Sequence, residues 1–142
     1  MLKKKMRLKI ITPRKVKVDE DVRMVIMRSI TGDVGILPGH APYSFVLDYG
    51  ILRIQSDDME RSIAVYGGVA HVQDSGITVL TEGAEWPDEI NVAYAEEIRE
   101  QAEERLREKQ DDMELQHDQV LLRRALVQIE VTSSLTIEED EE

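Results

Sequence analysis

The chain has 142 residues, which suits one ordinary domain or a small domain with an appendage. Its net charge is −11, and 42% of its residues are hydrophobic but only 4% are aromatic, so any core must be built from aliphatic side chains. The absence of cysteine excludes disulfides and thiolate metal sites, and no apolar run approaches the ~18 residues of a transmembrane helix or forms a secretion signal. We therefore expect any membrane association to be indirect.

Charge is distributed unevenly along the chain. Residues 1–30 carry ten Lys and Arg against three acids, whereas residues 87–142 carry six against eighteen. A basic amino end can attract nucleic acid or anionic lipid, but the lysines at 3–5 are more simply explained as a frayed leader. The acidic remainder argues against nucleic acid, because phosphate backbones are held by Lys and Arg. We expect no nucleic-acid partner.

The first half of the sequence is typical of β-structure. Short runs rich in Val, Ile, Thr and Tyr alternate with turn residues as far as residue 82. Strands at this spacing, without an intervening helical period, predict an antiparallel β-sandwich or flattened barrel. The predicted strands cover residues 8–12, 16–18, 22–30, 43–47, 51–55, 62–66, 69–73 and 77–81. We interpret Met24 and Met27 as parts of a strand that is buried on both sides.

Residues 32–42 form the most unusual stretch of the sequence. They read Gly-Asp-Val-Gly-Ile-Leu-Pro-Gly-His-Ala-Pro, with three glycines and two prolines. Because glycine allows positive φ and proline fixes φ, the segment is predicted to be a rigid hairpin or a looped crossing between strands. The spacing matches neither of the glycine-rich patterns that cradle a nucleotide phosphate. A stiff segment of this kind indicates a contact surface.

The pattern changes at residues 86–88, which read Trp-Pro-Asp. Pro87 disfavours helix at the residue before it, and Asp88 is a favourable N-cap for a helix that follows. Beyond this point an apolar residue recurs at every fourth position, which predicts an amphipathic helix. The stripe consists of Ile90, Tyr94, Ile98, Ala102 and Leu106.

A second amphipathic run follows, in which Asp118 and Gln119 weaken the apolar seam. Its apolar residues are Leu115, Leu122, Ala125, Leu126 and Ile129. The polar connection at 109–112 contains neither Gly nor Pro, so the two runs could form a hairpin or one long helix over residues 88–131. We predict an α+β fold: an antiparallel β-sandwich over 1–86, a two-helix antiparallel hairpin over 87–131, and an acidic, disordered tail over 132–142.

Residues able to carry out catalysis are not arranged in any recognisable pattern. His40, His71 and His117 are more than 30 residues apart and have no metal-ligand spacing, and no Gly-x-Ser-x-Gly elbow exists. Acidic residues are so abundant that pairs of carboxylates carry no information. We expect a non-catalytic protein without metal or cofactor.

Three blocks of sequence carry a resemblance to a known family. The chain resembles the epsilon subunit of F-type rotary ATP synthases, which is called delta in mitochondria. The matching blocks are residues 32–42, Ala64-Val-Tyr-Gly-Gly-Val-Ala-His-Val72 and Ile77-Thr-Val-Leu80. The resemblance extends from about residue 8 to about residue 131. It implies a subunit of the central stalk that binds the gamma subunit, stands on the ring of membrane c subunits, and lies peripherally at the cytoplasmic face of the cell membrane. By the same resemblance, Asp33 and His40 are candidate contacts with the ring.

The resemblance also implies a regulatory role for the two helices. In bacterial and chloroplast relatives they can extend alongside gamma into the head formed by the alpha and beta subunits and restrain ATP hydrolysis. Arg123 and Arg124 are the candidate inhibitory contacts, because basic residues of the second helix face an acidic segment of the beta subunits. The strongly acidic carboxy-terminal part opposes such docking.

Some bacterial relatives bind ATP through an Ile-Asp-x-x-Arg-Ala motif. The matching residues here are Ile90, Asn91, Tyr94 and Ala95, so that an amide replaces the carboxylate and a phenol replaces the guanidinium. Glu85 and Arg124 match other positions near that site, whereas Gln128 replaces a basic residue. We predict weak or absent ATP binding. An alternative to the stalk subunit is a free-standing β-sandwich adaptor or sensor with a mobile helical hairpin.

Overall fold

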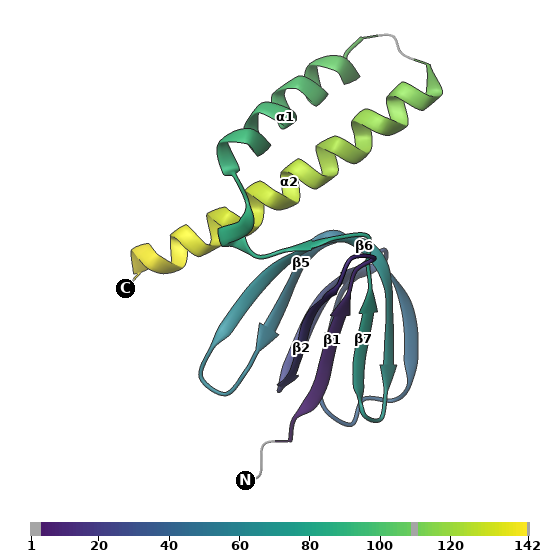
Figure 1. Ribbon diagram of the computed structural model, residues 1–142, viewed down its shortest axis with the longest axis vertical. Helices are drawn as coiled ribbons and strands as arrows, with labels where there is room; N and C mark the ends of the chain where they lie inside the picture. The colour runs from purple at the N-terminus through teal and green to yellow at the C-terminus, as the bar shows by residue number, and fades with distance from the viewer. Residues whose placement is uncertain (1–3, 109–110, 142) are drawn as a thin grey trace. The chain divides into compact units, whose positions relative to one another are not determined.

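The computed structural model describes residues 4–108 and 111–141, with side chains described as far as residue 133. The chain divides into two compact units, residues 1–85 and residues 86–142. The first unit is made of strands and the second of helices (Figure 1). An α+β arrangement with the strands first is therefore observed, as the sequence predicts.

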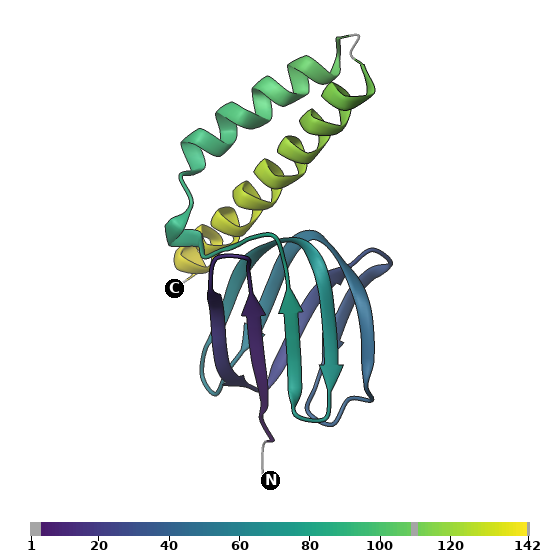
Figure 2. The same ribbon diagram turned by 45° about the vertical axis from the view of Figure 1, so that its right-hand side comes forward.

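The strands of the first unit form one continuous hydrogen-bonded path. They are β1 (Met6–Ile11), β2 (Val16–Val22), β3 (Met24–Ser29), β4 (Gly32–Ile36), β5 (Tyr43–Gln55), β6 (Glu60–Gln73), β7 (Gly76–Leu80) and β8 (Ala84–Glu85). Their order is β2-β1-β7-β6-β5-β3-β4, and β8 pairs with β6. The path curves so that strands face one another in two layers (Figures 1 and 2).

The long strands β5 and β6 belong to both layers. In their register Leu47 lies opposite Gly68 and Tyr49 lies opposite Tyr66. The single residue between these positions on each strand is not part of a ladder pair. Gly67 and Gly68 have φ of 75° and 123° at this bend. We predicted each strand as two separate ones. The glycines bend the strand without ending it, because the hydrogen-bonded ladder continues on both sides of the bend.

One strand pair departs from the antiparallel prediction. β1 and β7 are parallel, with Leu8 opposite Ile77 and Ile10 opposite Val79. All four side chains are buried. A short hairpin forces only sequence neighbours to run antiparallel, whereas β1 and β7 are far apart in the sequence and take the direction in which the chain arrives.

The core lies between the layers and is filled by the side chains that point inward from the strands. Its largest fully buried side chains are Leu8, Ile10, Val22, Val25, Met27, Ile36, Leu52, Ile54, Ile63, Ile77 and Val79. The expectation that Met24 and Met27 belong to a strand buried on both sides is wrong. Burial alternates along β3, so Met27 is buried while Met24 is half-buried.

The helical unit begins with a single 3-10 turn, η1 (Pro87–Glu89). The α-helix α1 (Val92–Leu106) starts three residues later, capped by Asn91, whose side-chain oxygen accepts a hydrogen bond from the Tyr94 amide at 3.1 Å. The prediction that Asp88 caps the helix is therefore wrong. Ile90 is extended, which ends the turn that Pro87 begins and makes a new cap necessary.

The two helices α1 and α2 (Asp112–Glu141) form an antiparallel hairpin (Figures 1 and 2). The predicted apolar stripe holds at Ala102, which is buried, but not at the start of the helix, where Ala95 is buried and Tyr94 is 60% exposed. On α2, Ala125 and Asp118 are buried while Leu126 is exposed. The helix continues beyond residue 131 into the segment that we expected to be a disordered tail, where neither Gly nor Pro interrupts it.

Candidate docking site

The segment 32–42 consists of a strand followed by a tight turn. Residues 32–36 form β4, which pairs with β3 as the sheet edge. A turn then runs from Leu37 to His40, closed by the His40 amide donating to the Leu37 carbonyl at 3.1 Å. Pro38 occupies its second position and Gly39, with φ of 86°, its third, which is the arrangement of a type II turn. The predicted rigidity therefore has two causes, the strand pairing and the turn.

Asp33 and His40 lie near opposite ends of β4. The Asp33 carboxylate is exposed, and one oxygen is 3.7 Å from the Nε of Arg28 on β3. The three residues from Asp33 to the end of β4 span about 10 Å of strand. His40 lies beyond that end, with its Nδ1 2.8 Å from the Ala41 carbonyl oxygen. Since a carbonyl only accepts, Nδ1 carries the proton and Nε2 is the acceptor of the neutral ring.

The outer face of the sheet carries a row of apolar side chains that sequence reasoning missed. The row crosses β2, β1, β7, β6 and β5, and the turn before β4 extends it. We call it the apolar band; its members are Val16, Ile11, Leu80, Val69, Val46 and Ile30. Val16, Leu80, Val46 and Ile30 are between 44% and 66% exposed. Five adjacent strands make the band about 19 Å long.

The apolar band has a signal in the sequence. Strands with one solvated face alternate apolar and polar residues, so two adjacent apolar residues place one of them on the outer face. Such doublets are Ile10-Ile11, Val46-Leu47, Val69-Ala70 and Val79-Leu80, and in each the band member is the outward one. Only the cross-strand register shows that these outward residues fall in one row.

The next row on the same face is polar. Ser44 pairs with His71, His71 with Thr78, and Thr78 with Lys9. The Ser44 hydroxyl and His71 Nδ1 are 2.7 Å apart. The apolar band is therefore an exposed apolar patch bordered by polar side chains, which is typical of a protein contact surface.

The residues considered for nucleotide binding are divided between the two units. Glu85 lies on β8 and accepts a hydrogen bond from the Tyr66 hydroxyl at 2.5 Å. Ile90, Asn91, Tyr94 and Ala95 surround the start of α1, where Asn91 is the cap and Ala95 is buried. Arg123 and Arg124 are exposed on α2. The cap role of Asn91 and the burial of Ala95 account for these two residues without a ligand.

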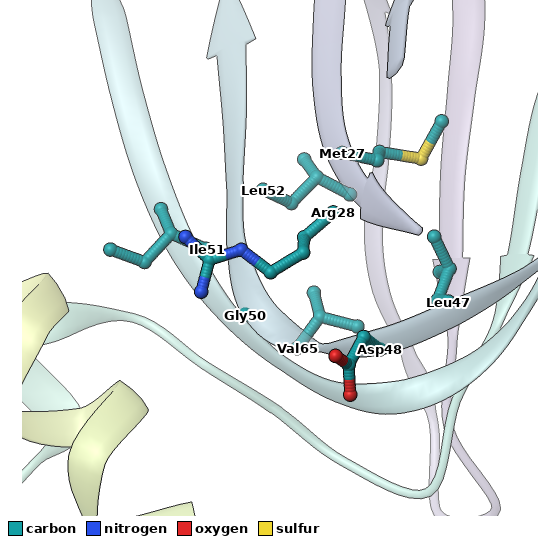
Figure 3. Close-up of a pocket in the computed structure, with 8 residues that line it drawn as sticks. All are labelled: Met27, Arg28, Leu47, Asp48, Gly50, Ile51, Leu52 and Val65. Atoms are coloured by element: carbon teal, nitrogen blue, oxygen red, sulfur yellow. The ribbon is translucent and has the colours of Figure 1, made fainter. Parts of the chain in front are cut away.

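A small open hollow lies where β3, β5 and β6 meet (Figure 3). The Arg28 and Asp48 side chains extend at its edge from β3 and β5. Its empty space is about 170 Å³ with the open solvent at its mouth included, which is too little for an enclosed ligand pocket. Across the described part of the chain, no group of three or more His, Asp and Glu side chains is placed to hold a metal ion. No helix there is long and apolar enough to cross a membrane.

The fold is therefore that of a two-unit protein in which a β-sandwich with an exposed apolar band is followed by a helical hairpin. The family model described as "ATP synthase, Delta/Epsilon chain, beta-sandwich domain" matches residues 5–87, and the corresponding long alpha-helix domain matches residues 88–133. The chain belongs to the ATP synthase delta/epsilon chain family. The predicted fold class and the predicted family are confirmed.

Curated relatives match over most of their length. The ATP synthase epsilon chain of Caldanaerobacter subterraneus subsp. tengcongensis is 35% identical over 89% of this chain and 92% of its own. That of Pelotomaculum thermopropionicum is 42% identical over 77% and 81%. The chloroplastic epsilon chain of Eucalyptus globulus is 33% identical over 89% and 96%.

A solved structure shares the fold. A chain from the Euglena gracilis mitochondrial ATP synthase, described as OSCP/F1/c-ring in rotational state 1, matches with a TM-score of 0.77 and 22% identity. The match covers 85% of this chain and 77% of that one. The likeness supports the order of sandwich and helical hairpin.

Proposed function

We propose that this chain is the rotor subunit of the central stalk of an F-type ATP synthase, which couples rotation of the c ring to ATP synthesis through the gamma subunit. The apolar band carries the proposal, because it gives a non-catalytic sandwich a preformed contact surface. The subunit lies at the cytoplasmic face of the membrane and reaches it only through the complex. The family membership favours this function over that of a free-standing adaptor.

In this proposal the apolar band is the surface that binds the gamma subunit. Its residues stand on hydrogen-bonded strands, so docking orders few new groups and the joint can transmit torque. An apolar centre with a polar border is the usual anatomy of a stable protein interface. The band therefore fits a partner that presents an apolar face.

Charged substitutions in the two neighbouring rows test this proposal. Leu80→Asp places a charge in the apolar band, and Thr78→Asp places the same charge one row away on the same strand. Burial of an unpaired carboxylate should weaken binding of the chain to a gamma-containing complex by about tenfold or more. Co-purification and surface plasmon resonance would measure it. Equal binding by both variants, each folded by circular dichroism, would contradict the role of the band.

The hairpin strand β4 and the turn after it are the proposed contact with the c ring. Asp33 offers an exposed carboxylate and His40 an imidazole beside the turn. Asp33→Asn together with His40→Gln should lower proton pumping relative to ATP hydrolysis in reconstituted membranes. Asp58→Asn, an acid in another turn, is the control. An unchanged ratio of pumping to hydrolysis in the double variant would remove these residues from the ring contact.

The helical unit is the proposed regulatory part, with Arg123 and Arg124 as contacts to the catalytic head. Both are exposed on α2. Deletion of residues 88–142 should raise ATP hydrolysis by the assembled complex, and Arg123→Gln with Arg124→Gln should reproduce part of that rise. Hydrolysis that is unchanged after the deletion would refute the regulatory role.

We infer weak or absent ATP binding from the same unit. Asn91→Asp keeps a side chain that caps α1 and restores the carboxylate of the nucleotide motif, and Tyr94→Arg restores its cation. The double variant should bind ATP more tightly than the natural chain in isothermal calorimetry. Micromolar affinity in the natural chain would overturn the inference.

A further inference from the structure

The apolar band is bordered on one side by a second row of side chains, which we call the polar row. Its members are Ser44 on β5, His71 on β6, Thr78 on β7 and Lys9 on β1, each opposite the next. Each stands two residues along its strand from a member of the apolar band, a separation of about 7 Å. Ser44 and Lys9 are exposed, and His71 and Thr78 are half-buried. The two rows therefore form one continuous surface.

Lys9 brings an uncompensated positive charge to the polar row. The residue opposite Lys9 on β2 is Asp19, but an Asp19 oxygen accepts a hydrogen bond from the Nε of Arg7 at 2.7 Å. Arg7 also pairs with Asp21 at 3.2 Å. Within the described part of the chain, Lys9 itself forms no ion pair. Because an ammonium group has only donors, Lys9 is suited to an acceptor on another molecule, and best to a carboxylate.

The ring of His71 is held by Ser44. The Ser44 hydroxyl oxygen and the His71 Nδ1 are 2.7 Å apart, which leaves Nε2 as the ring nitrogen for another partner. A charged imidazole donates from both nitrogens, and histidine is the side chain that ordinarily changes charge between about pH 5 and 8. Nε2 of His71 can therefore donate to a carboxylate, and it attracts one most strongly when the ring is charged.

No acid of the sandwich forms an ion pair with His71 among the described residues. The strands on either side of His71 place the neutral side chains of Ser44 and Thr78 opposite it. The charged side chains on or near this face are Lys9 and Arg7 on β1, Asp19 and Asp21 on β2, and Asp74 in the turn after β6. An acid that pairs with His71 must therefore come from another molecule.

We propose that the polar row binds a carboxylate of the partner that covers the apolar band. The carboxylate lies over Thr78, with His71 and Lys9 one strand away on either side as its donors. The inference rests on the proposed function, in which this partner is the gamma subunit. Apolar contacts have no direction, so the band alone does not orient the partner. Because the chain has a net charge of −11, a local set of donors determines where an acidic group of the partner can sit.

The pH dependence of binding tests the role of His71. Surface plasmon resonance would measure the affinity of the full-length chain for a gamma-containing complex at pH 6 and pH 8. The natural chain should bind about fivefold more tightly at pH 6. His71→Gln, which cannot gain a charge, should lose most of this difference, whereas His117→Gln, at an exposed position on α2, should keep it. The same pH dependence in His71→Gln as in the natural chain would overturn the proposal.

Moving the imidazole along its own strand tests the position of the site. His71→Gln combined with Gln73→His places the ring one row further from the apolar band, on the same face of β6. This double variant should bind with little dependence on pH, because the partner's carboxylate is held beside the band. Recovery of the full pH dependence would show that the polar row is not the site.

A charge at the centre of the polar row provides a second test. Thr78→Asp should bind about fivefold more weakly than Thr78→Asn at low salt, since the two side chains differ in charge and hardly in size. The difference should shrink at high salt, whereas the loss in Leu80→Asp should persist because it arises from burial. Equal affinities of the two Thr78 variants at low salt would remove the carboxylate from the row. If circular dichroism shows either to be unfolded, Lys9→Gln replaces them and should reduce the salt dependence of binding.

The same measurements separate the polar row from the proposed function. Tighter binding at pH 6 that depends on His71 supports both. Binding that is lost in Leu80→Asp but is equal at pH 6 and pH 8 supports the apolar band and overturns the polar row. A natural chain that does not bind the gamma-containing complex at either pH contradicts the proposed function, and the polar row then loses its partner as well.

Discussion

At the scale of single residues, two glycines are required by close approaches between strands. Gly68 has φ of 123°, and a Cβ there would lie 2.0 Å from the Leu80 carbonyl oxygen. Gly76 has φ of 152°, and its Cβ would lie 2.0 Å from the carbonyl oxygen of Arg7. Both neighbours are backbone atoms in the sheet, so they cannot move aside as a flexible side chain would. Gly76 therefore permits the parallel approach of β7 to β1. This pairing places the first strand of the sandwich beside one of its last.

Alanine substitution should separate a backbone clash from backbone strain alone. Gly68→Ala and Gly76→Ala should each lower the free energy of unfolding by about 2 kcal/mol or more. Gly39→Ala is the control, because φ there is 86° but nothing lies within 4 Å of its Cβ, and it should cost only about 1 kcal/mol. Urea unfolding would measure all three. Equal losses at the three positions would show that the approach to the neighbouring strand is unimportant.

At the scale of elements, an ion cluster joins segments that are distant in the sequence. Asp57, between β5 and β6, accepts a hydrogen bond from Lys5 at 2.9 Å and pairs through its other oxygen with Arg23, between β2 and β3. The hydrogen bond from Lys5 is the main cause that lowers the pKa of Asp57 below its usual 3.8, and the charge of Arg23 adds to it against partial desolvation. The cluster ties the amino end of β1 to the two turns.

The lowered pKa of Asp57 predicts the pH dependence of its contribution. A carboxyl whose pKa is depressed in the folded state stabilises the fold above its unfolded pKa and loses that contribution as pH falls through the folded value. Asp57→Asn should therefore reduce the urea midpoint at neutral pH, and the difference from the natural chain should shrink below about pH 3.8. Asp58→Asn in the same turn is the matched control. A difference that persists unchanged to pH 2 would contradict the ion-pair account. The Asp57 side chain is 49% exposed, so salt should screen the ion pair and reduce the difference between Asp57→Asn and the natural chain.

At the scale of the whole molecule, the chain consists of two units with separate internal contacts. The sandwich has its own pairing in every strand and its own aliphatic core. Among the described residues of the helical unit, the buried ones are Ala95, Ala102, Asp118, Ala125, Val127 and Val131. The two units are therefore stabilised differently, the first by paired strands around an aliphatic core and the second by packing between two helices.

The division predicts that the sandwich folds without the helices. A chain that ends at Glu85 should give dispersed amide resonances and unfold cooperatively in urea, because its strand registers lie within residues 6–85. The isolated segment 86–142 should be less cooperative, since the buried residues of α1 are two alanines, whose burial removes little apolar surface from water. A collapsed or unfolded 1–85 chain would show that the helices are needed to complete the core.

The fold was predictable wherever a local pattern suffices. Runs rich in Val, Ile, Thr and Tyr between turn residues located most strands, and the change at Trp86-Pro87 located the boundary region. The failures came where a residue's role depends on a distant partner. Asp118 looked like a weakness in the α2 seam and is a buried partner of Arg105. Asp88 was predicted to cap the helix. Because Ile90 is extended, α1 begins after it and Asn91 is the cap.

The candidate site was predictable in part. The stiff Gly- and Pro-rich segment is visible in the sequence because glycine and proline act on their own backbone. Its division into β4 and a turn required the pairing with β3, and the distance between Asp33 and His40 followed from that pairing. The Arg123, Arg124 and nucleotide assignments remain predictions from resemblance.

The sequence by itself determined the order of sandwich and helices, the aliphatic core and the family, because period, turn chemistry and motif order are local properties of the chain. Only the tertiary structure decided the parallel pairing of β1 with β7, the alignment of outward residues into the apolar band, and the closure of Asp118 on Arg105. Each of these depends on which distant residues meet. That information is a sum of packing and pairing energies over the whole chain, and no window of sequence contains it.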